Sequence, residues 1–383
     1  MSKRRGSGEG SVFQRKDGRW EASFYLENGK RRSFYGRTKK EALQRMRTAQ
    51  HEEKQGMLAT GQKQTLKQYL EHWLENVHKP KIRLSTYVEY RWARDKHILP
   101  ALGNIPIQKL TVQQVETLYS SKLKEGLSPG SIRNIHTVLH KALSHAVRTN
   151  LVARNVCDVV ELPRSRQDEM KPLTKEQAHI LLETAKEYHL ETLLLVAITA
   201  GMRRGELLGL KWQDIDFDDR NLQVRRTVNR VSRYGFIENE PKTSKGRRKI
   251  ALPEVVIESL KLHRVFQLEA RLKAGTQWQD RDLVFCNRNG GYFAPNYLLY
   301  LFHRLLNKAG LPDMRFHNLR HSAATFLLAM GVHVKIVQEL LGHSNISMTL
   351  GTYSHVLPGL QKEAMEKWNN WFGGDEDKDE ETS

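Results

Sequence analysis

The sequence predicts a multidomain α+β protein. We expect a small three-stranded sheet with one helix, then a helical bundle, then a mixed, mainly helical domain with a small antiparallel sheet. The 383 residues exceed what a single hydrophobic core normally serves. Strand-like patterns are confined to residues 11–35 and 221–252, whereas helix-start signals recur through the remainder.

Residues 11–54 have the pattern of two β-hairpins followed by a helix. The turns are predicted at Asp17-Gly18 and Asn28-Gly29, dipeptides typical of tight hairpins. The strands that they join are residues 11–16, 19–26 and 30–35. The middle strand alternates apolar and polar side chains, so we expect the following helix, opened by a capping box at 38–41, to cover the apolar face. The other face would remain free, with Arg19, Ser23 and Tyr25 on it.

Residues 62–160 show no strand alternation and contain several helix starts. Ser85 and Thr86 precede a helix at 87–98, and the capping box from Thr111 to Gln114 opens another that runs to about residue 124. A third helix begins at 128–131 and has one inward-facing apolar stripe: Ile135, Val138, Leu139, Ala142 and Ala146. Its other faces carry cations and histidines: Arg133, His136, His140 and Lys141. The segment therefore resembles a compact bundle with a basic flank.

Residues 162–172 are polar, include two prolines and lack periodicity, which indicates a linker. After it, a capping box at 174–177 begins a new helical run, and 221–228 and 248–252 look like strands. The last nine residues hold six acids and one lysine. We expect this tail to be a disordered solubilising end, with masking of a basic groove as the alternative. The predicted divisions are residues 1–60, 62–162, 163–173, 174–374 and 375–383.

The composition favours a polyanionic partner. Lys plus Arg number 62 against 43 Asp plus Glu, giving a net charge of +19, so the expected partner is nucleic acid or an acidic membrane surface. No apolar run is long enough to span a bilayer, and the N-terminus does not have the pattern of a secretory signal. Two cysteines, Cys157 and Cys286, are too few for a disulfide framework or a Cys-rich zinc site. The pattern indicates a soluble intracellular protein.

Four motifs in the last predicted domain carry side chains suited to chemistry on phosphates. They are Thr199-Ala-Gly-Met-Arg203-Arg-Gly-Glu206, Pro241-Lys242-Thr243, His317-Asn-Leu-Arg320-His321, and Leu340-Leu-Gly-His343 followed by Tyr353-Ser-His355. A phosphodiester under attack gains negative charge on its equatorial oxygens, and planar guanidinium groups are its best fixed partners. Nearby guanidiniums would also lower the pKa of a tyrosine and make it a usable nucleophile.

These motifs, in this order, resemble the tyrosine recombinases, the family of phage integrases and their relatives. The resemblance covers residues 62–372 in architecture, with all motifs in 170–372. Segment 11–54 also looks like the three-stranded arm-type DNA-binding domain of many phage and conjugative-transposon integrases. By this likeness the helical bundle would be the SAM-like core-binding domain and residues 174–374 the catalytic domain.

The resemblance implies a role for each motif residue. Tyr353 would attack and become linked to a DNA 3′ phosphate, while Arg203 and Arg320 bind the scissile phosphate. Lys242 would act as general acid and His317 would assist proton transfer. His343 would hydrogen-bond the phosphate, and Glu206 would support the arginines. The reaction would need no ATP, metal or other cofactor, because the phosphotyrosine bond conserves the phosphodiester energy.

Some assignments leave alternatives open. Lys245 is the alternative to Lys242 as the catalytic lysine, because it lies in the same basic segment. Its neighbours Arg247 and Arg248 are expected on a solvated, phosphate-contacting strand. His317 and His321 have the spacing of helical metal ligands but lack a third ligand nearby. Gly351, two residues before the tyrosine, either loosens its segment or is neutral. The predicted DNA contacts are Arg15, Arg19, Tyr25, Arg31, Arg133, Lys141, Lys245 and Arg247.

The predicted function is site-specific recombination that integrates and excises a mobile element or prophage. The resemblance implies double-stranded DNA with core and arm sites as substrate and a homotetramer working through a Holliday junction. It also implies a possible excisionase and a DNA-bending host protein, and a location in the bacterial cytoplasm at the nucleoid. Residues 357–371 are expected to dock on a neighbouring subunit. The alternatives are a type IB topoisomerase-like relaxing enzyme and a catalytically inactive DNA-binding regulator.

Overall fold

The computed structural model describes residues 10–25, 29, 31–54, 64–164, 172–241, 246–343 and 365. The chain divides into two compact units, residues 1–167 and 168–383. This division falls inside the predicted linker, while the finer domain boundaries stay a prediction. Lys242, Lys245, Gly351, Tyr353 and the acidic tail lie outside the described residues. Of the segment 357–371 the structure describes Met365, whose side chain is 54% exposed.

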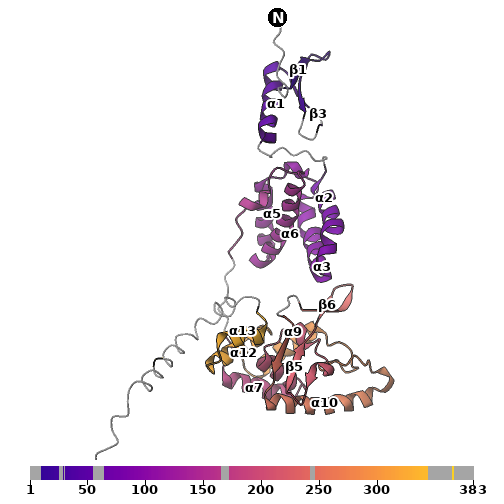
Figure 1. Ribbon diagram of the computed structural model, residues 1–383, viewed down its shortest axis with the longest axis vertical. Coiled ribbons are helices and arrows are strands. Elements are labelled where there is room, and N and C mark those ends of the chain that lie inside the picture. The colour runs from indigo at the N-terminus through magenta and orange to yellow at the C-terminus, as the bar shows by residue number, and fades with distance from the viewer. Residues whose placement is uncertain are drawn as a thin grey trace, which may run out of the picture. The chain divides into compact units, whose positions relative to one another are not determined.

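The first unit begins with the predicted three-stranded antiparallel sheet and its helix (Figure 1). Its elements are β1 (Ser11–Gln14), β2 (Trp20–Tyr25), β3 (Arg31–Gly36) and α1 (Lys39–Lys54). The helix covers one face of the sheet, where Ala22 and Phe24 pack with Ala42, Met46 and Ala49. Thr38 caps the helix by accepting a hydrogen bond from the backbone N–H of Glu41 at 3.2 Å. The predicted sheet and helix are confirmed.

The polar face of this sheet is less open than the sequence predicts. Glu21 and Ser23 are buried although no helix covers them. Arginines and serines of the sheet itself lie over them: Glu21 accepts from Arg15 at 3.3 Å and from Ser33 at 2.8 Å, and Ser23 accepts from Arg31 at 3.1 Å. The expectation of a free face is therefore wrong for these two side chains. Tyr25 is 71% exposed, as expected.

The remainder of the first unit is a helical bundle (Figure 1). Its elements are α2 (Leu66–His72), η1 (Trp73–His78), η2 (Lys79–Lys81), α3 (Leu84–Ala93), η3 (Arg94–Ile98), α4 (Leu99–Leu102), η4 (Ile107–Lys109), α5 (Val112–Lys124), α6 (Pro129–Arg148) and η5 (Val156–Val159). Thr111 and Gln114 form the predicted reciprocal cap, and Ser128 caps α6. Helix α3 begins at Leu84, earlier than the Ser85–Thr86 start that the sequence predicts, and no side chain caps it. The predicted inward stripe of α6 is fully buried.

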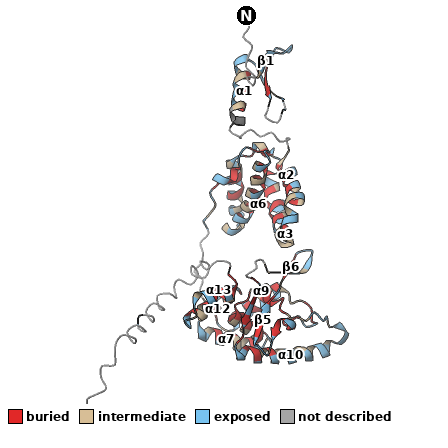
Figure 2. Cartoon of the chain, viewed as in Figure 1, coloured by how far each residue is buried: buried red, intermediate tan, exposed pale blue. Residues whose placement is uncertain are grey.

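In the second unit, helices and two small antiparallel sheets enclose a hydrophobic core, whose buried residues are red in Figure 2. Its helices are α7 (Lys175–Lys186), α8 (Glu191–Ala200), α9 (Arg204–Leu207), η6 (Trp212–Asp214), α10 (Glu254–Ala274), η8 (Gly275–Gln277), α11 (Pro295–Lys308), α12 (Asn318–Ala329) and α13 (Val334–Leu341). One antiparallel sheet has the order β4 (Ile215–Asp216), β5 (Asn221–Val224), β8 (Arg248–Ala251). A separate hairpin pairs β6 (Thr227–Val231) with β7 (Gly235–Asn239). Among the described helices, none has the length and apolarity needed to cross a membrane.

The predicted single strand at 221–228 is wrong, because it breaks into β5 and β6. Between them Arg226 turns back to the buried carboxylate of Asp214, with which it forms an ion pair, and also donates to the Gly209 carbonyl at 3.3 Å. A long-range ion pair thus overrides the local strand pattern. The hairpin that results packs β6 beside α9, which contains Glu206 and has Arg203 as its N-cap.

Candidate active site

Turns between helices bring the motif residues of the second unit together. Helix α8 ends at Gly201, whose φ of 56° is in the left-handed region, and α13 ends at Gly342 with φ of 65°. Glycine adopts this conformation without the steric penalty of a side chain, so both helices can stop sharply. Arg203 follows the first turn as the N-cap of α9, and His343 directly follows the second.

Arg320 lies between these two helix ends. It belongs to the first turn of α12 and is only 2% exposed. One guanidinium nitrogen donates to the Gly201 carbonyl at 2.7 Å, and another donates to the Leu341 carbonyl at 2.5 Å. The arginine therefore ties the ends of α8 and α13 together at the site.

Glu206 links two further arginines. Its carboxylate is 4% exposed and accepts from Arg203 Nη1 at 2.8 Å and from Arg248 Nη2 at 3.0 Å. It also accepts from the Arg203 backbone N–H at 3.0 Å. Burial acts to raise the pKa of Glu206, but Arg248 and Arg203 outweigh it and the pKa is lowered. Glu206 is therefore ionised at neutral pH and holds the guanidiniums of Arg203 and Arg248.

Arg248 does not lie on a solvated strand, and that prediction is wrong. Its side chain is 6% exposed, because β8 turns it inward while Arg247 points to solvent. Its Nε donates to the Leu340 carbonyl at 2.6 Å, and Nη1 donates to the Gly246 carbonyl at 3.2 Å. The sequence offered one signal for this: in β8, positions 248 and 250 share a face, and Ile250 is apolar.

Three histidines face the same arginines. Burial first, then Arg320 and Arg203, lower the pKa of His343 to about 4. Burial, His317 and Arg320 lower the pKa of His321 to about 4, and burial with Arg320 and Arg203 lowers the pKa of His317. The rings of His317 and His321 meet edge to face with centroids 4.9 Å apart. All three are therefore neutral at pH 7, and a bound anion would raise their pKa values.

The arrangement is suited to an anion with several oxygens. Arg203 is 41% exposed at its side chain and can reach a ligand from solvent, whereas Arg320 and Glu206 are buried and fixed. The structure brings together four of the six predicted catalytic residues: Arg203, His317, Arg320 and His343. Lys242 and Tyr353 lie outside the described residues, so their positions stay predictions. In the described part of the chain no group of three His, Cys, Asp or Glu side chains is placed to hold a metal.

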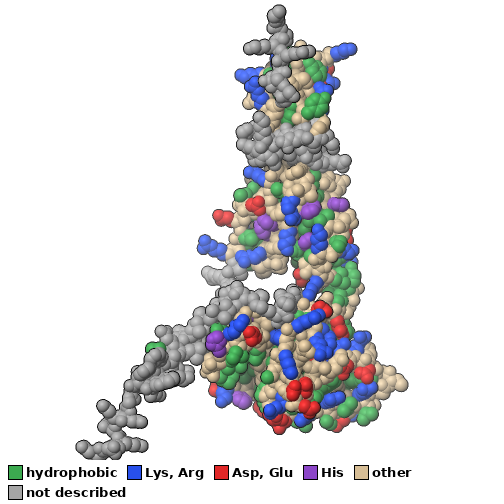
Figure 3. Space-filling view, in the orientation of Figure 1, with side chains coloured by type: hydrophobic (Ala, Val, Ile, Leu, Met, Phe, Trp, Pro, Cys, Tyr) green, Lys and Arg blue, Asp and Glu red, His purple; other side chains and the backbone are tan. Residues whose placement is uncertain are grey.

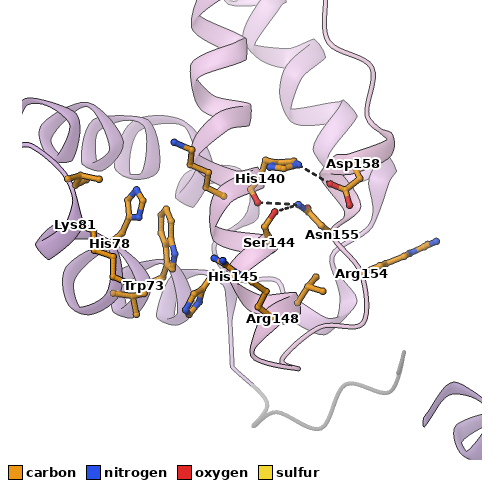
Figure 4. Close-up of a pocket in the computed structure, with 14 residues that line it drawn as sticks. Trp73, His78, Lys81, His140, Ser144, His145, Arg148, Arg154, Asn155 and Asp158 are labelled. Atoms are coloured by element: carbon orange, nitrogen blue, oxygen red, sulfur yellow. Dashed lines mark hydrogen bonds and ion pairs between the residues drawn. The ribbon is translucent and has the colours of Figure 1, made fainter. Parts of the chain in front are cut away.

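A basic pocket lies in the helical bundle of the first unit (Figure 4). Its volume is about 880 Å³, and it opens between η1–η2 and the C-terminal half of α6. Its lining includes Trp73, three histidines (His78, His140 and His145) and four cations (Lys81, Lys141, Arg148 and Arg154). Lys141, a predicted DNA contact, donates to the Tyr90 hydroxyl at 2.8 Å. Figure 3 shows Lys, Arg and His side chains gathered on the visible face of this bundle.

The other predicted DNA contacts are in different settings. Arg15 and Arg31 are both held by Glu21, at 3.3 and 3.8 Å, on the uncovered face of the first sheet. Arg19 instead pairs with Asp17 in the hairpin turn at 2.8 Å. Arg133 is exposed on α6, and Arg247 is exposed and paired with Glu240. The sequence did not single out Glu21, because its partners lie outside its own strand: Arg15 just after β1, and Arg31 and Ser33 in β3.

Comparisons with known proteins show the family to which this chain belongs. Residues 171–359 match the phage integrase family, and residues 65–123 match the N-terminal SAM-like domain of phage integrases. The chain is 33% identical over 366 residues to a tyrosine recombinase XerC-like protein of Caldanaerobacter subterraneus subsp. tengcongensis, covering 90% of this chain and 94% of that protein. The chain therefore belongs to the phage integrase family of tyrosine recombinases.

Integrases are among the other similar proteins. The chain is 25% identical to an integrase of Saccharopolyspora erythraea, over 96% of this chain and 98% of the relative. The solved Tn1549 transposon integrase in complex with transposon right end DNA superposes with a TM-score of 0.69 at 23% identity, covering 79% of this chain and 99% of that one. A lambda integrase tetramer bound to a Holliday junction gives a TM-score of 0.57 at 20% identity, covering 91% and 96%. These structures share the fold of this chain.

Proposed function

We propose that this recombinase cuts and rejoins DNA at specific sites through a 3′-phosphotyrosine intermediate, and so integrates and excises a mobile element or prophage. The observation that carries the proposal is the convergence of Arg203, Arg320, His317 and His343 at the ends of α8 and α13. Two guanidiniums and neutral imidazoles match the charge that develops on the equatorial oxygens of a phosphodiester under attack. The relatives named as integrases support the same activity.

Each residue has a proposed task in this reaction. Arg203 and Arg320 bind the scissile phosphate, and Glu206 fixes the guanidinium of Arg203. His343 donates a hydrogen bond to the phosphate, and His317 assists proton transfer with an imidazole that is neutral before DNA binds. Phosphate binding would raise both pKa values, which makes proton uptake part of complex formation.

Tyr353 is the proposed nucleophile, and Lys242 the proposed general acid. Tyr353 follows His343 by ten residues, a length of chain that spans up to roughly 33 Å, so reach does not limit its approach. Lys242 lies between β7 and β8, and β8 carries Arg248 into the site. Lys245 stays the alternative, because it immediately precedes Gly246, whose carbonyl binds Arg248.

DNA binding is proposed for both parts of the first unit. The pocket of the helical bundle would contact core-site phosphates through its lysines and arginines, which would make affinity strongly salt-dependent. Arg15 and Arg31 on the uncovered sheet face would contact arm sites. We further propose a homotetramer on two duplexes, the use of an excisionase and a DNA-bending host protein, and action at the nucleoid in the bacterial cytoplasm.

The test is strand cleavage without metal. Nicked duplexes carrying candidate attachment sites are incubated with the protein in EDTA, and denaturation-resistant adducts are counted. An adduct that Arg320→Lys abolishes, together with joining of two sites, supports the proposal. Relaxation of a plasmid that lacks any attachment site would favour the topoisomerase-like alternative, and specific binding without adduct would favour the regulator.

A further inference from the structure

Arg248 is buried and hydrogen-bonded beside the proposed phosphate site, although the sequence motifs described above do not include it. Three of its guanidinium contacts reach three different segments: Leu340 in α13, Gly246 before β8, and Glu206 in α9. The shortest of them, to the Leu340 carbonyl, is 2.6 Å. A buried cation is tolerated only when such partners compensate the loss of water, so this residue is fixed in place.

Its contacts extend in two directions. Through Glu206 it acts on Arg203, because one carboxylate oxygen binds Arg248 and the other binds Arg203 Nη1. Through Leu340 it holds the last turn of α13, where the following carbonyls, of Leu341 and Gly342, accept from Arg320 and Arg203. Three consecutive carbonyls at one helix end are thus bound by three arginines. Such carbonyls have no partner within the helix, and cations there are favoured by the helix dipole.

We propose that Arg248 is a positioning residue for strand cleavage: it orients Arg203 through Glu206 and fixes the end of α13, from which His343 and the Tyr353 segment extend. The proposal rests on the phosphate site described above. It assigns Arg248 no contact with DNA. The proposal therefore predicts that substitution of Arg248 slows DNA cleavage but leaves DNA binding intact, because the exposed cations of the first unit are unchanged.

A guanidinium is needed for this task. The acceptors lie at Nε, Nη1 and Nη2, so the planar fork binds α13 and Glu206 at the same time. A lysine ammonium is a single point and cannot span these acceptors. Arg248→Lys keeps the buried charge but loses the geometry, and Arg248→Met removes the charge and keeps the stem.

The experiment measures DNA affinity and the single-turnover rate of adduct formation on nicked attachment-site duplexes. Arg248→Lys and Arg248→Met should each slow adduct formation by about 100-fold, the cost of misplacing a reacting group by roughly 1 Å. Affinity should stay within about threefold of wild type. The matched control, Arg271→Met on α10, breaks an exposed ion pair to Asp280 and should leave both quantities unchanged. Absence of an adduct from the unsubstituted protein would instead count against the proposed function.

A double-mutant cycle with Glu206→Gln separates positioning from a general structural role. Because Arg248 acts partly through Glu206 and partly on α13, adding Arg248→Met to Glu206→Gln should slow cleavage further, but by clearly less than the roughly 100-fold expected for Arg248→Met alone. The double variant also removes both buried charges, which protects it from the instability of an unpaired ion. The proposal would be overturned if the rate loss of the double variant equalled the product of the two single losses. It would also be overturned if Arg248→Met lowered DNA affinity as much as it lowered the cleavage rate. Full cleavage by Arg248→Lys would overturn it too.

Discussion

Gly201→Ala should lower both the free energy of unfolding and the rate of DNA cleavage, for different structural reasons. Gly201 has φ of 56°, and its carbonyl accepts from Arg320. A Cβ at this position would lie 2.4 Å from Leu341 Cδ2 and 3.4 Å from Ala323 Cβ. Leu341 is fully buried, so its side chain is enclosed by close-packed neighbours and we expect it to shift together with its backbone. The added methyl must therefore displace the end of α13.

The expected cost has two parts. The left-handed conformation costs an L-residue about 1–2 kcal/mol, and overpacking of a filled core costs about 1–3 kcal/mol more. Gly201→Ala should therefore lower the free energy of unfolding by about 2–5 kcal/mol. Because the Leu341 carbonyl moves with its side chain, Arg320 loses its alignment, and cleavage should slow by about 100-fold for a shift of roughly 1 Å.

Gly310→Ala is the matched control. Gly310 also has a left-handed φ, of 63°, but nothing lies within 4 Å of its added Cβ. This variant should lose only about 1–2 kcal/mol and cleave at the wild-type rate. The assay combines urea unfolding with the adduct rate on nicked duplexes. Equal stability loss in the two variants, with unimpaired cleavage by Gly201→Ala, would refute the close approach of Gly201 to Leu341 on which this prediction depends.

Three other predictions concern pH, arm sites and salt. His321 and His343 have pKa values of about 4 in the folded chain, below the ordinary value, so the unfolded chain binds protons that the folded chain does not. The contribution of these two histidines to the free energy of unfolding is thus complete above about pH 6.5 and decreases as the pH drops toward 4. Urea unfolding at pH 7 and pH 5 measures this decrease. Equal free energies of unfolding at the two pH values would contradict the prediction. Glu21→Gln should lower the ratio of arm-site to non-specific DNA affinity several-fold, because Arg15 and Arg31 lose the carboxylate that both bind. Competition binding measures this ratio, and an unchanged ratio would show that Glu21 has no part in recognition. Arg148→Ala in the bundle pocket should reduce the slope of log affinity against log salt by about 1 at core sites, whereas an unaltered slope would place that cation outside the DNA contact.

Features that depend on residues close together in the chain, such as helix caps, could be predicted from the sequence. Thr111, Ser128 and Thr174 cap their helices as expected, because a capping box depends on residues only three positions apart. The family motifs also identified the residues that the structure gathers, among them Arg203 and Arg320.

What the sequence could not predict depends on contacts between distant segments. In the sequence, Arg248 is one of several consecutive basic residues on a predicted strand. Its contacts with Glu206 and α13 arise only from the tertiary fold. The predicted strand at 221–228 failed for the same reason, since Arg226 pairs with Asp214 across a turn. Glu21 is buried by side chains of neighbouring strands, which no alternation pattern within β2 reveals.

The identity of the nucleophile is central to the proposed reaction. Protein–DNA adducts formed in EDTA on nicked attachment-site duplexes should be digested with protease and nuclease, and the modified peptide sequenced by mass spectrometry. We predict a nucleotide joined through its 3′ phosphate to Tyr353, and no adduct from Tyr353→Phe. A nucleotide on any other residue, or an adduct that persists in Tyr353→Phe, would contradict the central claim.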